Sequence, residues 1–143
     1  MSIYILDTDT VSLYQHGHSL VCAAVLDHAG SDVVITVMTV EEQLSGWYSE
    51  LRRAKKAAVL AAVYQRMANT VGFYAKLPIL SFTEPAISRY ESLKRLKLSI
   101  GKTDLRIAAI ALEQADAVVV TRNGRDFRRV PGLQMKIGRN RLG

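Results

Sequence analysis

Short apolar runs alternate along the chain with longer segments of helical periodicity, and this alternation constrains the fold more than any other feature. The apolar runs predict short strands at 3–6, 33–36, 77–80, 118–120 and 135–137. The segments between them predict helices from near Thr10, at 20–28, from a Thr39 cap, over 51–75 as one long helix or a helix pair, at 86–96, and from a Thr103 cap to Ala115. Strands and helices in this order indicate βα units around a parallel sheet with both faces covered. The expected fold is α/β, a single domain with a central, mostly parallel sheet of four to five strands flanked by helices.

Length and composition agree with one domain. The chain has 143 residues, of which 49% are hydrophobic, so 1–143 can form one compact unit, with a tail at 138–143 that we expect to be loosely held. No stretch is long and apolar enough to cross a bilayer, and the first residues lack the pattern of a secretory signal. The lone Cys22 cannot form an internal disulfide. Together these features predict a cytoplasmic protein.

The charge is basic, with a formal net value of +6, and its distribution is uneven. Seven basic residues and a single acid, Asp126, lie between Arg122 and Arg141. Such an excess suits a polyanionic partner, because lysine and arginine displace the counterions that phosphates hold. A second run, Arg52 to Lys56, we interpret as a solvated face.

Acidic residues follow the predicted strands at the end where parallel sheets bind their ligands. They come after the first strand, after the second strand, at the start of the helix beyond Gly101, and after the strand at 118–120: Asp7, Asp9, Glu41, Glu42, Asp104 and Asp126, with Asn123 among them. Taken singly, each acid is better explained as a helix cap, because Glu42 and Asp104 both lie in predicted first turns, where negative charge is favourable. Capping does not require the acids to share one sheet edge, so the joint pattern indicates a site.

Crowded carboxylates repel one another, and a divalent cation relieves that repulsion. Mg²⁺ prefers oxygen ligands and retains several waters, so a few carboxylates and a substrate phosphate can hold it. A metal bound in this way activates water for attack on phosphorus. The chain contains no glycine-rich phosphate loop, which argues against a nucleotide-cofactor enzyme.

Four segments, in this order along the chain, resemble the PIN-domain ribonucleases, specifically the VapC-like toxins of toxin–antitoxin pairs. They are 5–9 (Ile-Leu-Asp-Thr-Asp), 39–46 (Thr-Val-Glu-Glu-Gln-Leu-Ser-Gly), 104–111 (Asp-Leu-Arg-Ile-Ala-Ala-Ile-Ala) and 120–127 (Val-Thr-Arg-Asn-Gly-Arg-Asp-Phe), the last followed by Val-Pro-Gly-Leu at 130–133. The second resembles the family pattern Thr-x-x-Glu-Leu-x-x-Gly, with Gln43 in place of leucine. The third resembles Asp-x-x-Ile-Ala-Ala.

This resemblance implies an endoribonuclease that depends on Mg²⁺, for which Mn²⁺ can substitute. It also implies a toxin that cuts cellular RNA, is held inactive by a cognate antitoxin and forms a homodimer. Asp7, Glu42 and Asp104 match the first three family acids and are the expected metal ligands, with Glu42 chosen over Glu41 by its spacing to Gly46. The fourth acidic position holds Asn123, so the expected catalytic set takes Asp126 as its fourth member. Asn123, Thr121 and Asp9 are expected to support the site, and the expected contacts to the RNA backbone are Arg122, Arg125, Arg128 and Arg129.

Two other interpretations stay open. The run Asp7-Thr8-Asp9-Thr10 resembles the Asp-x-Asp-x-Thr motif of haloacid-dehalogenase phosphatases, in which Asp7 would be the nucleophile. That family needs an acidic pair after a late strand, where this chain has Thr121, Arg122 and Asn123. Alternatively, Asn123 could mark a PIN domain that binds RNA without cutting it.

Overall fold

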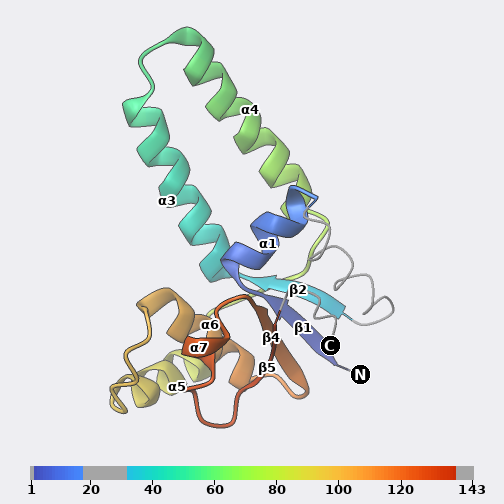
Figure 1. Ribbon diagram of the computed structural model, residues 1–143, viewed down its shortest axis with the longest axis vertical. Helices are drawn as coiled ribbons and strands as arrows, with labels where there is room; N and C mark the ends of the chain where they lie inside the picture. Colours follow the sequence, from blue (N-terminus) through green and yellow to red (C-terminus); the bar gives the residue numbers. More distant parts are fainter. Residues whose placement is uncertain (1, 18–31, 138–143) are drawn as a thin grey trace.

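A computed structural model of the protein describes residues 2–17 and 32–137 and shows an α/β fold built on a parallel sheet (Figure 1). The strands are β1 (Ile3–Leu6), β2 (Asp32–Thr36), β3 (Ile79–Leu80), β4 (Ala117–Thr121) and β5 (Gln134–Ile137). They lie in the order β3-β2-β1-β4-β5, and every neighbouring pair is parallel. The predicted sheet is confirmed, with β5 at an edge, β1 in the centre and β4 beside it.

Six helices surround this sheet in the described residues: α1 (Thr8–Gln15), α3 (Val37–Arg53), α4 (Ala57–Tyr74), α5 (Glu84–Lys94), α6 (Lys102–Leu112) and α7 (Gly124–Phe127). The helix predicted at 20–28, Cys22 and the tail at 138–143 lie outside the described residues. None of the helices described is long and apolar enough to span a membrane.

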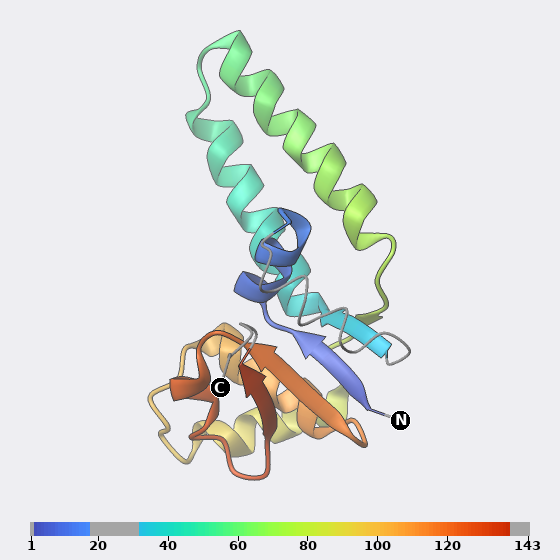
Figure 2. The same cartoon turned by 45° about the vertical axis from the view of Figure 1, so that its right-hand side comes forward.

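Successive residues of the central strands pack on opposite faces of the sheet, as strand geometry requires. One face presents Ile5, Val34 and Val119 to a core completed by α5, α6 and Phe127. The other face presents Leu6, Ile35 and Val120 to a smaller core completed by Val11 of α1 and Tyr74 of α4. Figure 2 shows these helices on either side of the strands. Because both faces are covered, the strands read as continuous apolar runs.

The two longest helices, α3 and α4, form a hairpin that projects away from the sheet (Figure 1). The residues between them, 54–56, make the turn at its far end. The prediction for 51–75 allowed a helix pair, and a pair is present. However, Leu51 to Arg53 belong to α3, because nothing breaks that helix before Ala54 and Arg52 and Arg53 suit its C-terminal dipole.

Two predicted helix caps are wrong. Thr36, not Thr39, caps α3: its backbone is extended and its hydroxyl accepts from the Met38 N–H at 3.2 Å. Thr39 is fully buried inside the helix. Gly101, not Thr103, precedes α6. The earlier start of α3 moves Glu42 from the first turn, where it was expected, to the second.

Candidate functional site

The acidic site begins where the central strands end. The register pairs Leu6 with Val120, so the next residues, Asp7 and Thr121, lie side by side at the C-terminal edge of the sheet. The Thr121 hydroxyl donates to Asp7 Oδ2 at 2.5 Å. Asp7 Oδ1 accepts from the Thr10 N–H at 3.0 Å, so Asp7 ends β1 and also caps α1. These two hydrogen bonds hold the Asp7 side chain in one orientation, and only 4% of the residue is exposed.

Asn123 connects the remaining acids at this edge. Its backbone N–H donates to the Thr121 hydroxyl at 2.8 Å. Its side-chain Nδ2 donates to Asp126 Oδ2 at 2.9 Å and, over a longer 3.5 Å, to Asp104 Oδ2. Asp104 lies in the first turn of α6 and Asp126 in the short helix α7, so the amide joins these two helices. Asn123 therefore orients two carboxylates rather than standing in for one.

The carboxylates of this edge repel one another. Burial, followed by the charges of Asp7 and Glu42, raises the pKa of Asp104 from its ordinary 3.8 to about 6. Asp126 adds to that rise, and the Asn123 hydrogen bond opposes it. Burial also raises the pKa of Asp7, against hydrogen bonds from Thr10 and Thr121 that lower it. The charge on this edge is thus incompletely compensated by the protein itself.

Glu42 and Asp9 reach the site mainly through their charge. Both residues are exposed, Glu42 in the second turn of α3 and Asp9 in the first turn of α1. Glu42 contributes to the raised pKa of Asp104, and Asp9 to that of Asp7. The structure therefore brings Asp7, Asp104, Asn123, Thr121 and Asp126 together through hydrogen bonds, and it leaves Glu42 and Asp9 at the rim.

The donor set fits a hard divalent cation. Among the described residues, no three histidine, cysteine, aspartate or glutamate side chains are close enough to form a ready-made metal cage. Mg²⁺ does not need one, because one or two carboxylates, waters and substrate phosphates suffice. The chemistry at this edge is carboxylate oxygen, and the raised pKa values of Asp7 and Asp104 mark where a cation would be most favoured.

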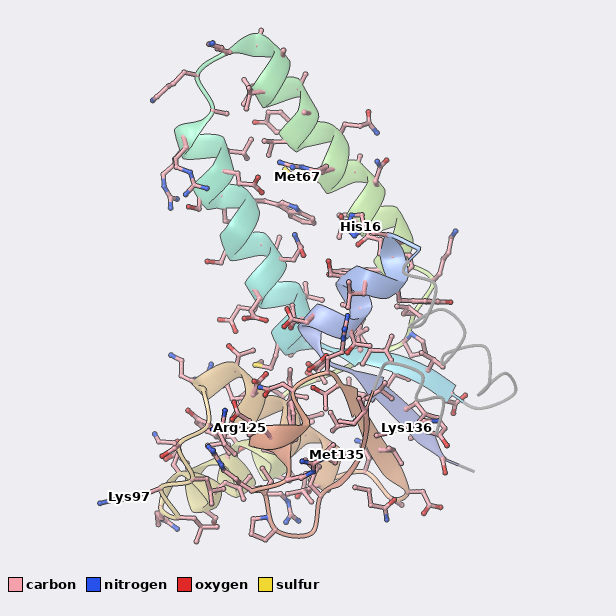
Figure 3. All side chains as sticks on the ribbon, in the orientation of Figure 1. His16, Met67, Lys97, Arg125, Met135 and Lys136 are labelled. Carbon is pink, nitrogen blue, oxygen red and sulfur yellow. The ribbon has the colours of Figure 1, made fainter. Side chains whose placement is uncertain are left out.

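The four arginines expected to contact RNA are all exposed around α7, and Figure 3 shows Arg125 projecting from it. They are not equivalent. Arg129 donates to the backbone oxygens of Ser99, at 3.1 Å, and Leu98, at 3.4 Å, and lies 3.6 Å from Asp126. It therefore braces the loop between α5 and α6. Arg122, Arg125 and Arg128 form no ion pair within the described residues, so they remain the candidates for backbone contact.

Thr10 contributes to the site and Thr39 ties neighbouring helices together, and neither is among the predicted site residues. The backbone N–H and hydroxyl of Thr10 both lower the pKa of Asp7, although the hydroxyl forms no well-shaped hydrogen bond within the described chain. The Thr39 hydroxyl pairs with that of Thr8 at 3.0 Å, which ties α3 to the start of α1. The spacing Asp7-x-x-Thr10 is an N-cap pattern and could have identified Thr10. The sequence pattern predicts Thr39 as a helix cap, and that prediction left its hydrogen bond to Thr8 unforeseen.

Comparison with known proteins identifies the fold. No protein-family model matches the chain, and no curated protein does. Solved structures do match. VapBC2 from Rickettsia felis, bound to a DNA fragment from its promoter, gives a TM-score of 0.73 at 24% identity, over 94% of this chain and 97% of that chain. DNA-bound VapBC from Salmonella typhimurium gives 0.73 at 24%, over 95% and 98%. VapBC-5 from Mycobacterium tuberculosis, of a family of toxin–antitoxin systems, gives 0.62 at 26%, over 98% and 100%.

The described sheet, its flanking helices and these matches define an α/β protein with the PIN fold. Within that fold, the chain is similar to the VapC-like toxins over nearly its whole length. The resemblance predicted from the four sequence segments is thereby confirmed at the level of the fold.

Proposed function

We propose that this protein is a Mg²⁺-dependent endoribonuclease that cleaves cellular RNA as the toxin of a toxin–antitoxin pair. One observation carries the proposal: Asp7, Asp104 and Asp126 meet at one sheet edge, where hydrogen bonds from Thr121 and Asn123 hold them. Partial burial and the charges of Asp7 and Glu42 raise the pKa of Asp104 there to about 6. A protein that concentrates negative charge in this way is suited to bind a cation. The exposed arginines beside the same edge suit a polyanionic substrate.

The residues of the site have distinct proposed roles. Asp7 and Asp104 would hold the cation, with Glu42 completing the set from the rim, and Mn²⁺ could replace Mg²⁺. When bound, the metal would supply activation of water and stabilisation of charge at the phosphate. Asp126, held by the Asn123 amide, accepts a proton or orients a water at the same edge. Arg122, Arg125 and Arg128 position the RNA backbone.

The proposed partners follow from the structures that this chain is similar to. Those structures are VapBC assemblies, and one of them is described as a member of a family of toxin–antitoxin systems. We extend this to the chain as a proposal: it binds a cognate antitoxin protein and forms a homodimer in the cytoplasm.

The test is cleavage of total cellular RNA, followed by sequencing of the new RNA ends. Wild-type protein should cut with Mg²⁺ or Mn²⁺ and stop in EDTA. Asp104→Asn should reduce the rate by about 100-fold or more. Asp116→Asn is the matched control. Asp116 is exposed immediately before β4, and its positive φ of 57° is one that asparagine tolerates. No cleavage by the wild type, or equal cleavage by Asp104→Asn, would refute the proposal.

The alternatives gain no support from the site. The phosphatase alternative needs an acidic pair after a late strand, and β4 ends in Thr121 and is followed by Arg122 and Asn123 instead. A labelled phosphoenzyme at Asp7 would nevertheless favour that function. The inactive RNA-binding alternative rests on Asn123, which supports Asp126 and Asp104 rather than leaving the site without acids. Metal-dependent cleavage by the wild type excludes it.

A further inference from the structure

The turn of the α3–α4 hairpin carries a cluster of four cations, Arg52, Arg53, Lys55 and Lys56, which we name the tip cluster. All four residues are exposed. In the described part of the chain, none forms an ion pair, and Arg53 donates only to the Ser49 hydroxyl at 2.9 Å. Figure 1 shows this turn at the end of the molecule farthest from the sheet. The cluster therefore projects unpaired positive charge into solvent.

Stability of the hairpin does not account for the two lysines. Arg52 and Arg53 lie in the last turn of α3, where positive charge is favourable. Lys55 and Lys56 instead precede α4, and the N-terminus of a helix disfavours positive charge. No acid lies in the first turn of α4, and Lys56 provides no side-chain cap. The lysines thus oppose the local electrostatics, which indicates a role outside the fold.

Helix α3 connects this cluster to the acidic site. Glu42 and Arg53 are eleven residues apart, which is close to three helical turns, so they share one face about 16 Å apart along the axis. Between them, that face carries Ser45, Gly46 and Ser49, and a Cβ at Gly46 would meet open space. No bulky side chain separates the acid at one end of this face from the arginine at the other.

We propose that the tip cluster binds the phosphate backbone of RNA that flanks the cleaved bond, with the intervening strand lying along the Glu42–Arg53 face of α3. This inference rests on the proposed ribonuclease function and adds a second contact region to it. Cations that form no ion pair fit a polyanion, whose condensed counterions they displace. Tyr48 is 55% exposed and lies one helical turn before Arg52, and aromatic surface beside a cation suits stacking on unpaired bases at the tip. The RNA is therefore expected to be single-stranded.

The test compares two labelled single-stranded RNAs, of about 20 and about 5 nucleotides, by fluorescence anisotropy in EDTA over a range of salt. Lys55→Gln with Lys56→Gln should weaken binding of the longer RNA about 3- to 10-fold and lower its salt slope by about 1.4. Binding and metal-dependent cleavage of the short RNA should stay at the wild-type level. The matched control is Lys94→Gln with Lys97→Gln, two exposed lysines near the end of α5; Figure 3 shows Lys97 far from the hairpin turn.

The outcomes separate this inference from the proposed function. If the wild type cleaves neither RNA with Mg²⁺ or Mn²⁺, the ribonuclease proposal fails and this inference fails with it. If cleavage is intact but the tip variant binds the longer RNA like the wild type, or no worse than the control variant, only this inference fails. A poly-glutamate peptide could bind the wild type as tightly as the RNA and lose that binding in the tip variant. That result would overturn this inference and assign the tip cluster to an acidic protein segment.

Discussion

Thr121 and Asp7 are joined across the central pair of strands, with the threonine hydroxyl donating to the buried carboxylate at 2.5 Å. The same hydroxyl accepts from the Asn123 N–H. The Thr121 hydroxyl oxygen therefore orients Asp7 and also the backbone of Asn123. The side-chain amide of Asn123 in turn contacts Asp104 and Asp126. A threonine at a strand end is often a turn residue, but here its hydroxyl is satisfied on both sides inside the protein.

Replacing Thr121 with valine keeps the shape of the side chain and removes this hydroxyl. Asp7 Oδ2 then loses its donor and the Asn123 N–H its acceptor, so we expect a loss of about 1–3 kcal/mol in the free energy of unfolding. RNA cleavage should fall by about 10-fold or more as the acids lose their alignment. Thr121→Ser should retain most of both. Urea denaturation and cleavage kinetics test this, and a serine variant as impaired as valine would contradict it.

The raised pKa of Asp104 predicts how stability depends on pH without metal. Its folded pKa, about 6, lies above its ordinary 3.8, so between these values the folded state binds a proton that the unfolded chain releases. Stability contributed by this group is therefore present at about pH 4 and falls as the pH rises through the folded pKa. Because solvent screens a partly exposed carboxylate, the loss above that pKa is about 1–2 kcal/mol. Asp7 shifts in the same direction.

Asp104→Asn should therefore be more stable than the wild type at about pH 8 in EDTA, by about 1–2 kcal/mol, and nearly equal to it at about pH 4. Added Mg²⁺ should stabilise the wild type and close the gap, because a ligand that binds only the folded state adds to its stability. Denaturant titrations at both pH values, with and without Mg²⁺, measure this. A variant that is less stable than the wild type at the higher pH would overturn the electrostatic account of the site.

Asn123→Asp tests the fourth position. The new carboxylate cannot donate to Asp126 or Asp104, and it adds a negative charge beside both. Without metal, the variant should be less stable than the wild type by about 1–2 kcal/mol, and its Mn²⁺ affinity should rise. Calorimetric titration with Mn²⁺ is the measurement. Asn123→Ala separates the two effects, because it removes the amide without adding charge and should not raise the affinity.

Arg129 and Arg125 should behave differently although both lie at α7. Arg129 bonds the carbonyls of Leu98 and Ser99, in a loop where Lys97 and Ser99 have positive φ values of 52° and 60°. Such backbone is strained and persists only when the surroundings hold it. Arg129→Ala should lower the free energy of unfolding by about 1–2 kcal/mol and speed hydrogen exchange at 96–101. Arg125→Ala should leave stability unchanged and weaken RNA binding, and equal effects on stability would contradict this division.

Much of this fold was predictable from the sequence. Apolar runs such as 118–120 are long enough, and bounded sharply enough, to mark buried strands, and the acid after the first strand falls where parallel sheets bind ligands. The caps were not predictable in the same way. Thr36 and Thr39 both precede helical sequence. A local pattern cannot show that the Thr39 hydroxyl is hydrogen-bonded to that of Thr8, which lies 31 residues earlier.

The division of labour inside the site was also hidden from the sequence. Arg129 has the same local character as Arg125, and only the fold brings it to the carbonyl of Ser99. Asn123 looks like a missing acid in the sequence because its carboxylate partners are not evident there. One of them, Asp104, lies in α6, which only tertiary packing brings beside Asn123, and the other, Asp126, lies in α7. Side-chain partners across elements depend on distances that spacing along a chain does not encode.

The position of β4 beside β1 has a consequence for how the protein is made. Thr121 and Asp7 are 114 residues apart, and β1 is paired on one side with a strand that is synthesised long after it. A growing chain on the ribosome can form the α3–α4 hairpin early, but it cannot close the centre of the sheet until residues 117–121 have emerged. Asp104, Asn123 and Asp126 also arrive late. A nascent chain that stops before Asp126 cannot hold the assembled acidic edge, so the activity proposed for this site would begin only after that residue has emerged.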